Sequence, residues 1–298
     1  MKKITSISAF HRMLDLPSPL HPLVSVIRLD EANIVYGENW QHFQGEFYSI
    51  ALKRDVQCKV TYGQKHYDFD IGIMSFMAPR QVHSLVREQV ENASGMVLLF
   101  HPDLLWKHPL ARVIRLYSFF DYAVDEALHL SEKEESDITG LFERIIKESS
   151  RIDRHTQEII VSHIALLLSY AQRFYERQFI TRQKVNYELL DKFRQLITEQ
   201  FEAGSLLKSG RLTVHDLAGK LNLSPDYLSD MLRVHTGQNA QQHLQEMLIE
   251  KARELLISTK MTVAEIAYHL GFEYPQSFNK LFKAKTNCSP LQFRRSLN

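Results

Sequence analysis

The stretch GFEYPQSFNKLFKAKTNCSP, residues 271–290, has the pattern of one short amphipathic helix with lysines on its outer side. Pro275 suits the first turn of a helix, because the amide that proline lacks would have no helical partner there. Phe278 and Phe282 are four positions apart and therefore share one face. Asn287 follows where a left-handed residue can close the helix, a conformation that asparagine tolerates well. The stretch therefore predicts a helix that packs on its phenylalanines and presents its polar side outward.

A similar stretch lies about fifty residues earlier, and the two together form a repeat. Each copy begins with a threonine that is followed three residues later by Asp216 or Glu265, which is the capping box of a helix start. A short apolar-faced helix comes next, and then a turn of sequence Leu-Asn-Leu-Ser or Leu-Gly-Phe-Glu. The copies are TVHDLAGKLNLSPDYLSDMLRVHTGQN, residues 213–239, and TVAEIAYHLGFEYPQSFNKLFKAKTNCS, residues 262–289.

The second half of each copy predicts another helix. Pro225 and Pro275 open these helices, and Gly237 and Asn287 close them. Two short helices joined by a turn form a helix-turn-helix, whose second helix can enter the major groove of DNA. Between the copies, residues 239–259 predict one long helix. Such a rigid connector would hold two reading helices at a fixed separation, which is about 34 Å for one turn of the duplex.

Residues 205–298 resemble the double helix-turn-helix domain of the AraC/XylS family of bacterial transcription regulators, and the second copy is the stronger match. Two positions depart from the family pattern. Asn287 stands where the family usually has glycine, and Leu248 stands where it often has arginine, so any polar role at that position is lost. The matching positions are Ile266-Ala267, Gly271-Phe272, Ser277, Phe278, Phe282-Lys283, Ser289-Pro290 and Phe293-Arg294.

The resemblance implies a sequence-specific DNA-binding transcription regulator, more often an activator than a repressor, with an N-terminal domain that senses an effector. We therefore expect double-stranded promoter DNA as a partner, a homodimer, RNA polymerase as a further partner, and a small-molecule or protein effector. No cofactor, metal or enzymatic activity is expected.

The outward side of each second helix supplies candidates for reading bases. Gln276 can bind adenine with two hydrogen bonds, and Lys280 can reach the acceptors of guanine. The first copy instead carries two carboxylates, Asp226 and Asp230. These would either accept from cytosine amino groups or only cap and charge the helix surface. The base-reading candidates are Tyr274, Pro275, Gln276, Asn279, Lys280, Asp226, Ser229 and Asp230.

Further basic residues suit DNA phosphates, which position a protein without specifying a sequence. Residues 208–298 contain twelve Lys and Arg against eight Asp and Glu, whereas residues 1–207 contain twenty-four against twenty-seven. A basic tail on a mildly acidic body favours a polyanionic partner, although each lysine alone could equally be a solvated surface charge. The phosphate candidates are Arg233, Lys283, Lys285, Arg294 and Arg295.

The first part of the chain has the sequence pattern of a β-domain. Short runs rich in Val, Ile, Phe and Tyr are separated by Gly, Pro, Asn and Asp, which is typical of a small sandwich or barrel. By analogy with longer members of the family, this part would be a cupin-like sensory domain. The expected strands are 24–29, 47–54, 58–63, 66–72, 73–78 and 95–100.

The middle of the chain predicts helices. Ser131 and Glu134 form a capping box for a helix over 131–149, and another helix is expected over 187–204. The helix expected over 154–179 is unusually apolar, so it would either pack on its own domain or also form a dimer seam. The expected fold class is α+β, with a β-rich sensory domain over 1–125, a helical segment over 126–203 and an all-α double helix-turn-helix domain over 204–298.

An effector pocket could be lined by residues that alternate on the expected strands, although a core would use the same residues equally well. Two other functions stay open. The first is a cupin-type metal enzyme, for which His66, His83 and His101 are the candidates, although they lack the near-adjacent pair of such sites. The second is an interaction scaffold whose tail tethers it to DNA. The pocket candidates are Tyr48, Tyr62, Tyr67, Phe69, Phe76 and His83.

The remaining totals restrict the class of protein. The 298 residues, 44% of them apolar, suffice for about two domains. Cys58 and Cys288 stand alone, as free thiols in a reducing compartment do. The start lacks the apolar segment of a signal peptide, and no apolar run approaches the ~20 residues that span a bilayer. We therefore expect a cytoplasmic protein without a membrane partner.

Overall fold

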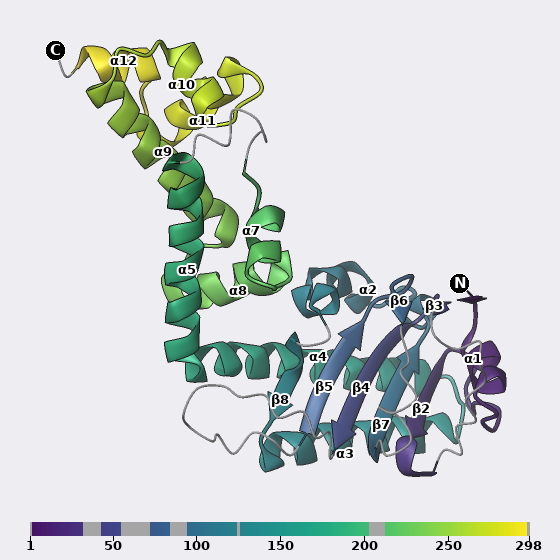
Figure 1. Cartoon of the computed structure of the whole chain (residues 1–298). Helices are drawn as coiled ribbons and strands as arrows, with labels where there is room; N and C mark the ends of the chain where they lie inside the picture. The colour runs from purple at the N-terminus through teal and green to yellow at the C-terminus, as the bar shows by residue number, and fades with distance from the viewer. Residues whose placement is uncertain are drawn as a thin grey trace. The chain divides into compact units, whose positions relative to one another are not determined.

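The computed structural model describes residues 2–31, 43–54, 72–83, 94–123, 126–202 and 212–296 of the chain. They divide into two compact units, Met1–Gln178 and Phe179–Asn298, whose elements are labelled in Figure 1. This division differs from the expected boundaries at 125/126 and 203/204. The helical residues 126–178 group with the strands, and the next helix groups with the helix-turn-helix repeat, because each buries its apolar side there.

A five-stranded antiparallel sheet in the order β2-β7-β4-β5-β8 lies in the first unit (Figure 1). Four expected strands are confirmed, because β2, β4, β5 and β7 occupy the runs that begin at residues 24, 47, 73 and 95. The strand expected over 58–63 lies outside the described residues, as does the one expected over 66–72 except for Gly72, which begins β5. The strands are β2 (Val24–Arg28), β4 (Tyr48–Arg54), β5 (Gly72–Met77), β7 (Ser94–Phe100) and the unpredicted β8 (Leu128–Leu130).

A second, three-stranded sheet has the order β1-β3-β6, with β1 and β3 parallel. It consists of β1 (Lys2–Ile4), β3 (Phe43–Gly45) and β6 (Val82–His83), and α1 (Ile7–Met13) follows β1. Ile4, Phe10 and Phe43 form a common core with Ile27 and Leu99 of the larger sheet. The first unit is therefore a mixed helix-and-sheet fold with two sheets, and its assignment as a cupin-like sandwich or barrel remains a prediction.

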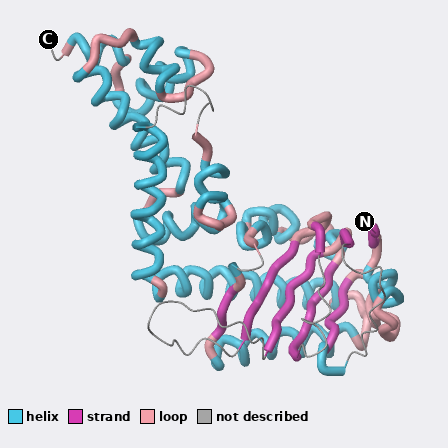
Figure 2. Tube along the Cα trace, viewed as in Figure 1, coloured by secondary structure: helices cyan, strands magenta, loops and turns pink. Residues whose placement is uncertain are grey.

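Short helical turns connect β7 to β8, and two long helices follow. The helix α3 (Glu132–Ser149) starts at the predicted capping box, in which Glu134 N donates to Ser131 Oγ and Ser131 N donates to Glu134 Oε2. It contacts both edge strands, β2 and β8, and therefore crosses one face of the sheet (Figure 2). The turns are η3 (Pro102–Leu105), α2 (Leu110–Val113), η4 (Ile114–Leu116) and η5 (Ser118–Asp121), and η1 (Leu29–Glu31) follows β2.

The apolar stripe of α4 (Thr156–Thr181) packs within the chain itself. All seven residues that suggested a dimer seam are at most 5% exposed in the single chain, so the simpler expectation, packing on the domain's own core, holds for them. They are Ile160, Ile164, Leu167, Leu168, Ala171, Phe174 and Tyr175. Among the described helices, none combines the length and the apolar character that crossing a membrane requires.

The described part of the second unit is helical. Its central helix, α9, contacts α5, α7, α8, α10, α11 and α12. Leu244, Leu248 and Ala252 of α9 are buried in this core, so leucine at 248 packs as an apolar residue. The helices are α5 (Gln183–Glu202), α7 (Val214–Lys220), α8 (Pro225–Thr236), α9 (Ala240–Ser258), α10 (Val263–His269), α11 (Pro275–Thr286) and α12 (Pro290–Arg295).

Candidate nucleic-acid interface

Both copies of the repeat begin with the predicted capping boxes. Asp216 N donates to Thr213 Oγ1 at 3.2 Å, and Glu265 N donates to Thr262 Oγ1 at 3.2 Å. The carboxylates accept from the threonine amides in return, at 3.0 Å and 2.6 Å. Hydrogen bonds from Thr213 and Thr262 lower the pKa values of the Asp216 and Glu265 carboxyls. The first helix of each copy, α7 or α10, therefore starts where its sequence predicts.

The turns of the two copies share one backbone geometry. Asn222 and Gly271 occupy equivalent positions and both have positive φ, 55° and 79°. The next residue then donates back to a buried alanine, Leu223 N to Ala218 O at 3.0 Å and Phe272 N to Ala267 O at 2.9 Å. An alanine at this point leaves room for the following helix to cross closely.

The second helices end alike. Gly237 closes α8 with φ 77°, and Asn287 closes α11 with φ 61°, so both adopt the left-handed conformation that the sequence predicts. Just before them, Thr236 Oγ1 donates to Leu232 O at 2.8 Å, and Thr286 Oγ1 donates to Phe282 O at 2.7 Å.

The repeat continues into a third helix that the sequence analysis did not predict. Gln292 N donates to Ser289 Oγ at 3.2 Å and starts α12, with Pro290 in its first turn. The equivalent bond in the first copy, Gln242 N to Asn239 Oδ1 at 2.9 Å, starts α9. The sequence carries this signal, because Ser289 is followed three residues later by Gln292, just as Asn239 is followed by Gln242 at the start of the connector.

The helix α11 has a buried apolar side and an exposed polar side. Phe278 and Phe282 are 1% and 0% exposed, and Phe282 packs against Phe293 of α12 with ring centroids 5.7 Å apart. The opposite side carries amide and ammonium groups on successive turns. The predicted base-reading residues Gln276, Asn279 and Lys280 are exposed, as are the phosphate candidates Lys283 and Lys285. Tyr274, the N-cap residue, is 58% exposed beside the half-buried Pro275.

The corresponding side of α8 has little free charge. Arg233 Nη1 forms an ion pair with Asp230 Oδ1 on the same helix, and the Asp230 side chain is only 15% exposed. Asp226 is exposed in the first turn, and Ser229 is half-buried. Because Asp230 and Arg233 already satisfy each other, the surface of α8 lacks the cationic character of α11.

The comparisons with known proteins concern mainly this domain. Residues 217–296 match a family described as a helix-turn-helix domain. The Msm operon regulatory protein of Streptococcus mutans is 34% identical over 86 residues, which are 29% of this chain and 31% of that protein. An uncharacterized HTH-type transcriptional regulator of Haemophilus influenzae is 23% identical over 280 residues, 86% of this chain and 92% of that protein.

The helix-turn-helix domain over residues 217–296 is of the AraC/XylS type. Among solved structures, the C-terminal domain of AraT, a response regulator from Geobacillus stearothermophilus, is 35% identical, with a TM-score of 0.32. That comparison covers 36% of this chain and 84% of AraT's domain. The match to the Msm regulator spans about a third of that protein.

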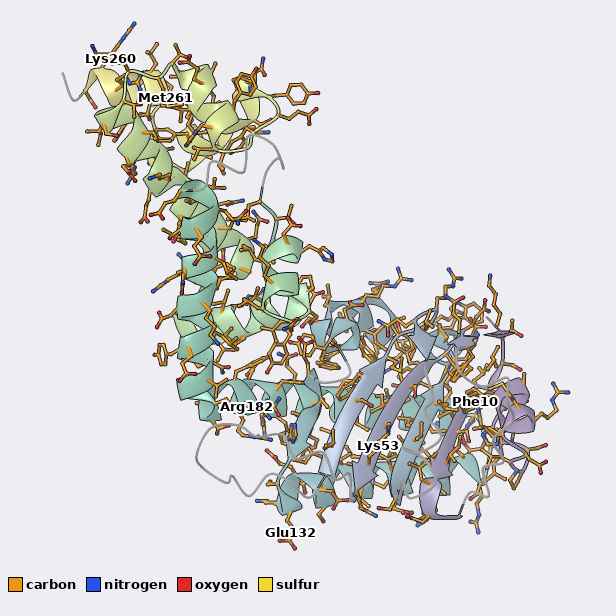
Figure 3. The ribbon with its side chains drawn as sticks, viewed as in Figure 1. Phe10, Lys53, Glu132, Arg182, Lys260 and Met261 are labelled. Carbon is orange, nitrogen blue, oxygen red and sulfur yellow. The ribbon has the colours of Figure 1, made fainter. Side chains whose placement is uncertain are left out.

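One phosphate candidate of the AraC/XylS-type domain has a different role. Arg294 was expected at DNA, but its Nε donates to Leu256 O at 3.0 Å and its Nη1 to Met261 O at 2.6 Å. Figure 3 labels Met261 in the connection between α9 and α10. The guanidinium therefore holds α12 to that connection, and Arg294 is withdrawn as a phosphate contact. Its neighbour Arg295 is exposed.

The second compact unit also includes α5, which the sequence predicts as part of the helical segment over 126–203. Asn186 Nδ2 donates to Phe179 O at 2.8 Å and lies 2.9 Å from His235 Nε2 of α8, which is itself 3.1 Å from Phe179 O. Burial lowers the pKa of His235, and the hydrogen bond to Phe179 O opposes that shift. The Phe179 and Tyr227 rings meet edge-to-face with centroids 5.1 Å apart. These contacts tie the first reading helix to the start of α5, and nothing local in the sequence indicates them.

The predicted effector-pocket residues are core residues where the structure describes them. Tyr48 is 7% exposed and stacks on Phe100 with centroids 4.9 Å apart, and burial raises its pKa. Phe76 is 5% exposed and packs on Phe119 at 4.5 Å. These two therefore fill the core and do not line an open pocket. Tyr62, Tyr67 and Phe69 lie outside the described residues, and His83 is described only through its backbone, which pairs with Phe43.

The three histidines considered for a metal site are only partly described. His101 Nδ1 accepts from Asp103 N at 3.2 Å and caps η3. His66 lies outside the described residues. Within the described ranges, no group of three or more His, Cys, Asp and Glu side chains is arranged to hold a metal ion.

Proposed function

We propose that the chain is a one-component regulator that binds promoter DNA sequence-specifically through α8 and α11. In this proposal the first unit senses an effector, two chains pair, and the complex activates transcription together with RNA polymerase. The observation that carries the proposal is the exposed row of Gln276, Asn279, Lys280 and Lys283 on α11, opposite the buried phenylalanines.

The chemistry of this row suits base edges and phosphates. Gln276 and Asn279 carry amides that can bind adenine with two hydrogen bonds, and Lys280 can donate to guanine O6 or N7. Lys283, Lys285 and Arg295 follow toward the end of the domain, where they would neutralise phosphates. Tyr274 and Pro275 stand at the start of α11, the part of a recognition helix that contacts bases.

The two helix-turn-helix copies would contribute unequally to the recognition of the DNA sequence. The ion pair between Asp230 and Arg233 leaves α8 without a free cation on that turn, and approach of Asp230 to phosphates would cost affinity. We therefore assign most discrimination between sequences to α11, while α8 contributes shape and orientation.

Selection of bound genomic fragments by the full-length chain, at fixed low salt and again at higher salt, tests this function. We expect a motif with two short blocks about ten base pairs apart, one helical turn. Gln276→Ala and Lys280→Ala should each relax one position of the motif by about 1–3 kcal/mol. Asp230→Ala, the matched change on α8, should leave the motif unchanged.

Binding without any motif, lost steeply with salt, would reduce the function to phosphate contact. A motif that survives both α11 substitutions but disappears with Asp230→Ala would overturn the assignment of the reading helix.

Pairing of two chains is proposed through the outer side of α4. Ile159 and Leu166 remain 38% and 45% exposed there, and their spacing of seven residues puts them on one face. Leu166→Glu should convert the dimer to a monomer in sedimentation experiments. Leu116→Glu changes a leucine of η4 that is 78% exposed, and the dimer should persist in this control. If neither variant changes the mass in solution, α4 does not form the seam.

Activation is tested by transcription in vitro from a selected promoter. Adding the full-length chain to RNA polymerase should raise the transcript yield, and the Lys280→Ala variant should not. A fall in yield with the unaltered chain would identify a repressor.

A further inference from the structure

A pocket of about 300 Å³ lies at the open edge of the larger sheet, inside the first unit. Its floor is β2, an edge strand, and its walls are the Pro-rich segment 16–20 and the last turns of α3. All five residues of β2 line it, although successive side chains point to opposite faces of a strand. The pocket therefore follows the edge of the strand, between residues 16–20 and the last turns of α3.

Two buried serine oxygens line this pocket with their hydrogens already committed. His11 Nδ1 donates to Pro17 O at 2.5 Å, because a carbonyl can only accept. Burial lowers the pKa of His11, so the ring is neutral and its Nε2 must accept the hydrogen of Ser25, at 2.9 Å. On the opposite wall, Ser149 Oγ donates to Ile145 O at 2.8 Å. The hydroxyl oxygens of Ser25 and Ser149 can therefore act toward the pocket only as hydrogen-bond acceptors.

The strand edge adds one donor and one acceptor. His101 N donates to Leu23 O, so the hydrogen-bonded pairs of the β2–β7 ladder fall on odd-numbered residues of β2. The amide and carbonyl of Val26 consequently point away from β7, and Val26 lines the pocket. A ligand that donates to the serines and to the Val26 carbonyl, and accepts from the Val26 amide, would satisfy all of these groups.

The described lining contains no carboxylate and no unbalanced cation. His11 is neutral, and Arg28 Nη2 forms an ion pair with Glu143 Oε2 at 2.5 Å. A carboxylate group has no hydrogen for the serine oxygens, and either a carboxylate or an ammonium group would be buried here without a counter-charge. Leu16, Pro17 and Val24 supply apolar contact.

We infer that this pocket binds a small neutral hydroxylated molecule, of the size and chemistry of an acyclic polyol. Hydroxyl groups both donate and accept, as Ser25, Ser149 and Val26 require. The volume lies at the lower end of the range of ligand pockets, which restricts the ligand to a few carbons with their hydroxyls. Residues of the first unit alone form this binding site, whereas its role as the effector site rests on the proposed function.

Saturation-transfer NMR on the full-length chain with erythritol and xylitol tests the site, with erythronate and xylonate as charge-bearing counterparts. We expect transfer to the neutral polyols and little to the acids. Ser149→Val should weaken polyol binding at least tenfold. Ser150→Val is the matched control, because Ser150 makes the same kind of bond, to Lys147 O at 2.7 Å, at an exposed position outside the pocket.

Hydrogen exchange of the Val26 amide gives a second measurement that needs no variant, should Ser149→Val fail to fold. Xylitol at millimolar concentration should slow this exchange and leave the edge amides of β8 unchanged. The inference is overturned if no neutral polyol binds, if the acids bind as well, if both serine variants behave alike, or if exchange at Val26 is unaffected.

The affinity of the full-length chain for its selected DNA, with and without xylitol, separates the two proposals. Polyol binding that leaves DNA affinity unchanged would uphold the site and contradict the sensory role of this pocket. A change in DNA affinity of at least threefold that disappears in Ser149→Val would support both.

Discussion

Asn287 shows how one residue closes α11. Its φ of 61° places it in the left-handed region, where a side chain with a β-carbon is strained and asparagine is tolerated better than most residues. Gly237 occupies the equivalent position in the first copy with φ 77°. Asparagine in place of the family's glycine therefore retains the left-handed backbone conformation at this position.

Substitution at position 287 should follow this preference. We expect Asn287→Ala to lower the free energy of unfolding by about 1 kcal/mol, because alanine lacks the tolerance of asparagine for this conformation. Asn287→Gly should not lower it. Urea unfolding of the full chain, followed by a probe in the second unit, measures both. Equal stability of the alanine and glycine variants would show that the left-handed geometry is not kept in solution.

Arg294 and Arg295 are neighbours with opposite roles. Arg294→Ala removes two bonds to main-chain carbonyls and should destabilise the second unit by about 2 kcal/mol, since hydrogen bonds of charged groups are worth about 1.5–3 kcal/mol. Arg295→Ala should leave stability unchanged and reduce the salt dependence of DNA binding by about one phosphate contact. Thermal unfolding and a salt titration of DNA affinity distinguish the two. The reverse result would restore Arg294 as a phosphate contact.

At the scale of the element, short reciprocal caps position the helices of both repeats. Thr262→Ala should cost about 1 kcal/mol, because the Glu265 amide loses its acceptor at the start of α10. Ser258→Ala, which removes an exposed bond to Glu254 O, should have little effect and serves as the control. Denaturant unfolding measures both variants. If they are equally stable, α10 is held by packing alone.

For the whole molecule, buried neutral histidines make stability depend on pH. Burial lowers the pKa of His11, His21, His163, His235 and His243, which lie in both units. The unfolded chain then binds more protons than the folded one below the ordinary histidine pKa of about 6.5. The free energy that these neutral histidines contribute to folding is therefore complete above about pH 6.5. It is lost as the pH falls from there toward the lowered pKa values of the folded chain.

Melting temperatures of the full chain between pH 7.5 and 5.5 test this linkage. We expect them to fall with pH, and the slope should become smaller in a His11→Asn, His235→Asn double variant. A flat profile across this range would mean that these histidines are not desolvated in solution.

Local physics made the helix-turn-helix repeat predictable from sequence. The capping boxes at Thr213 and Thr262, the prolines at 225 and 275, and the left-handed closures at 237 and 287 each depend on residues within one or two turns. The same pattern at Ser289 and Gln292 would also have located α12. Four of the strands were predictable for a similar reason, because each is a compact apolar run.

Only the tertiary structure could decide the contacts between distant segments. The parallel pairing of β1 with β3 joins residues about forty positions apart, and Arg294 bonds to carbonyls 33 and 38 positions away. Asn186 meets His235 across 49 positions, and this contact lies within the second unit, which contains α5. Tyr48 and Phe76, which were candidates for an effector pocket, are core residues, whereas the pocket that the structure contains lies at the edge of β2. Sequence alone located the capped helices of the repeat and four strands of the larger sheet, because those signals are local. Packing decided which faces met, because burial depends on partners that the local sequence does not name.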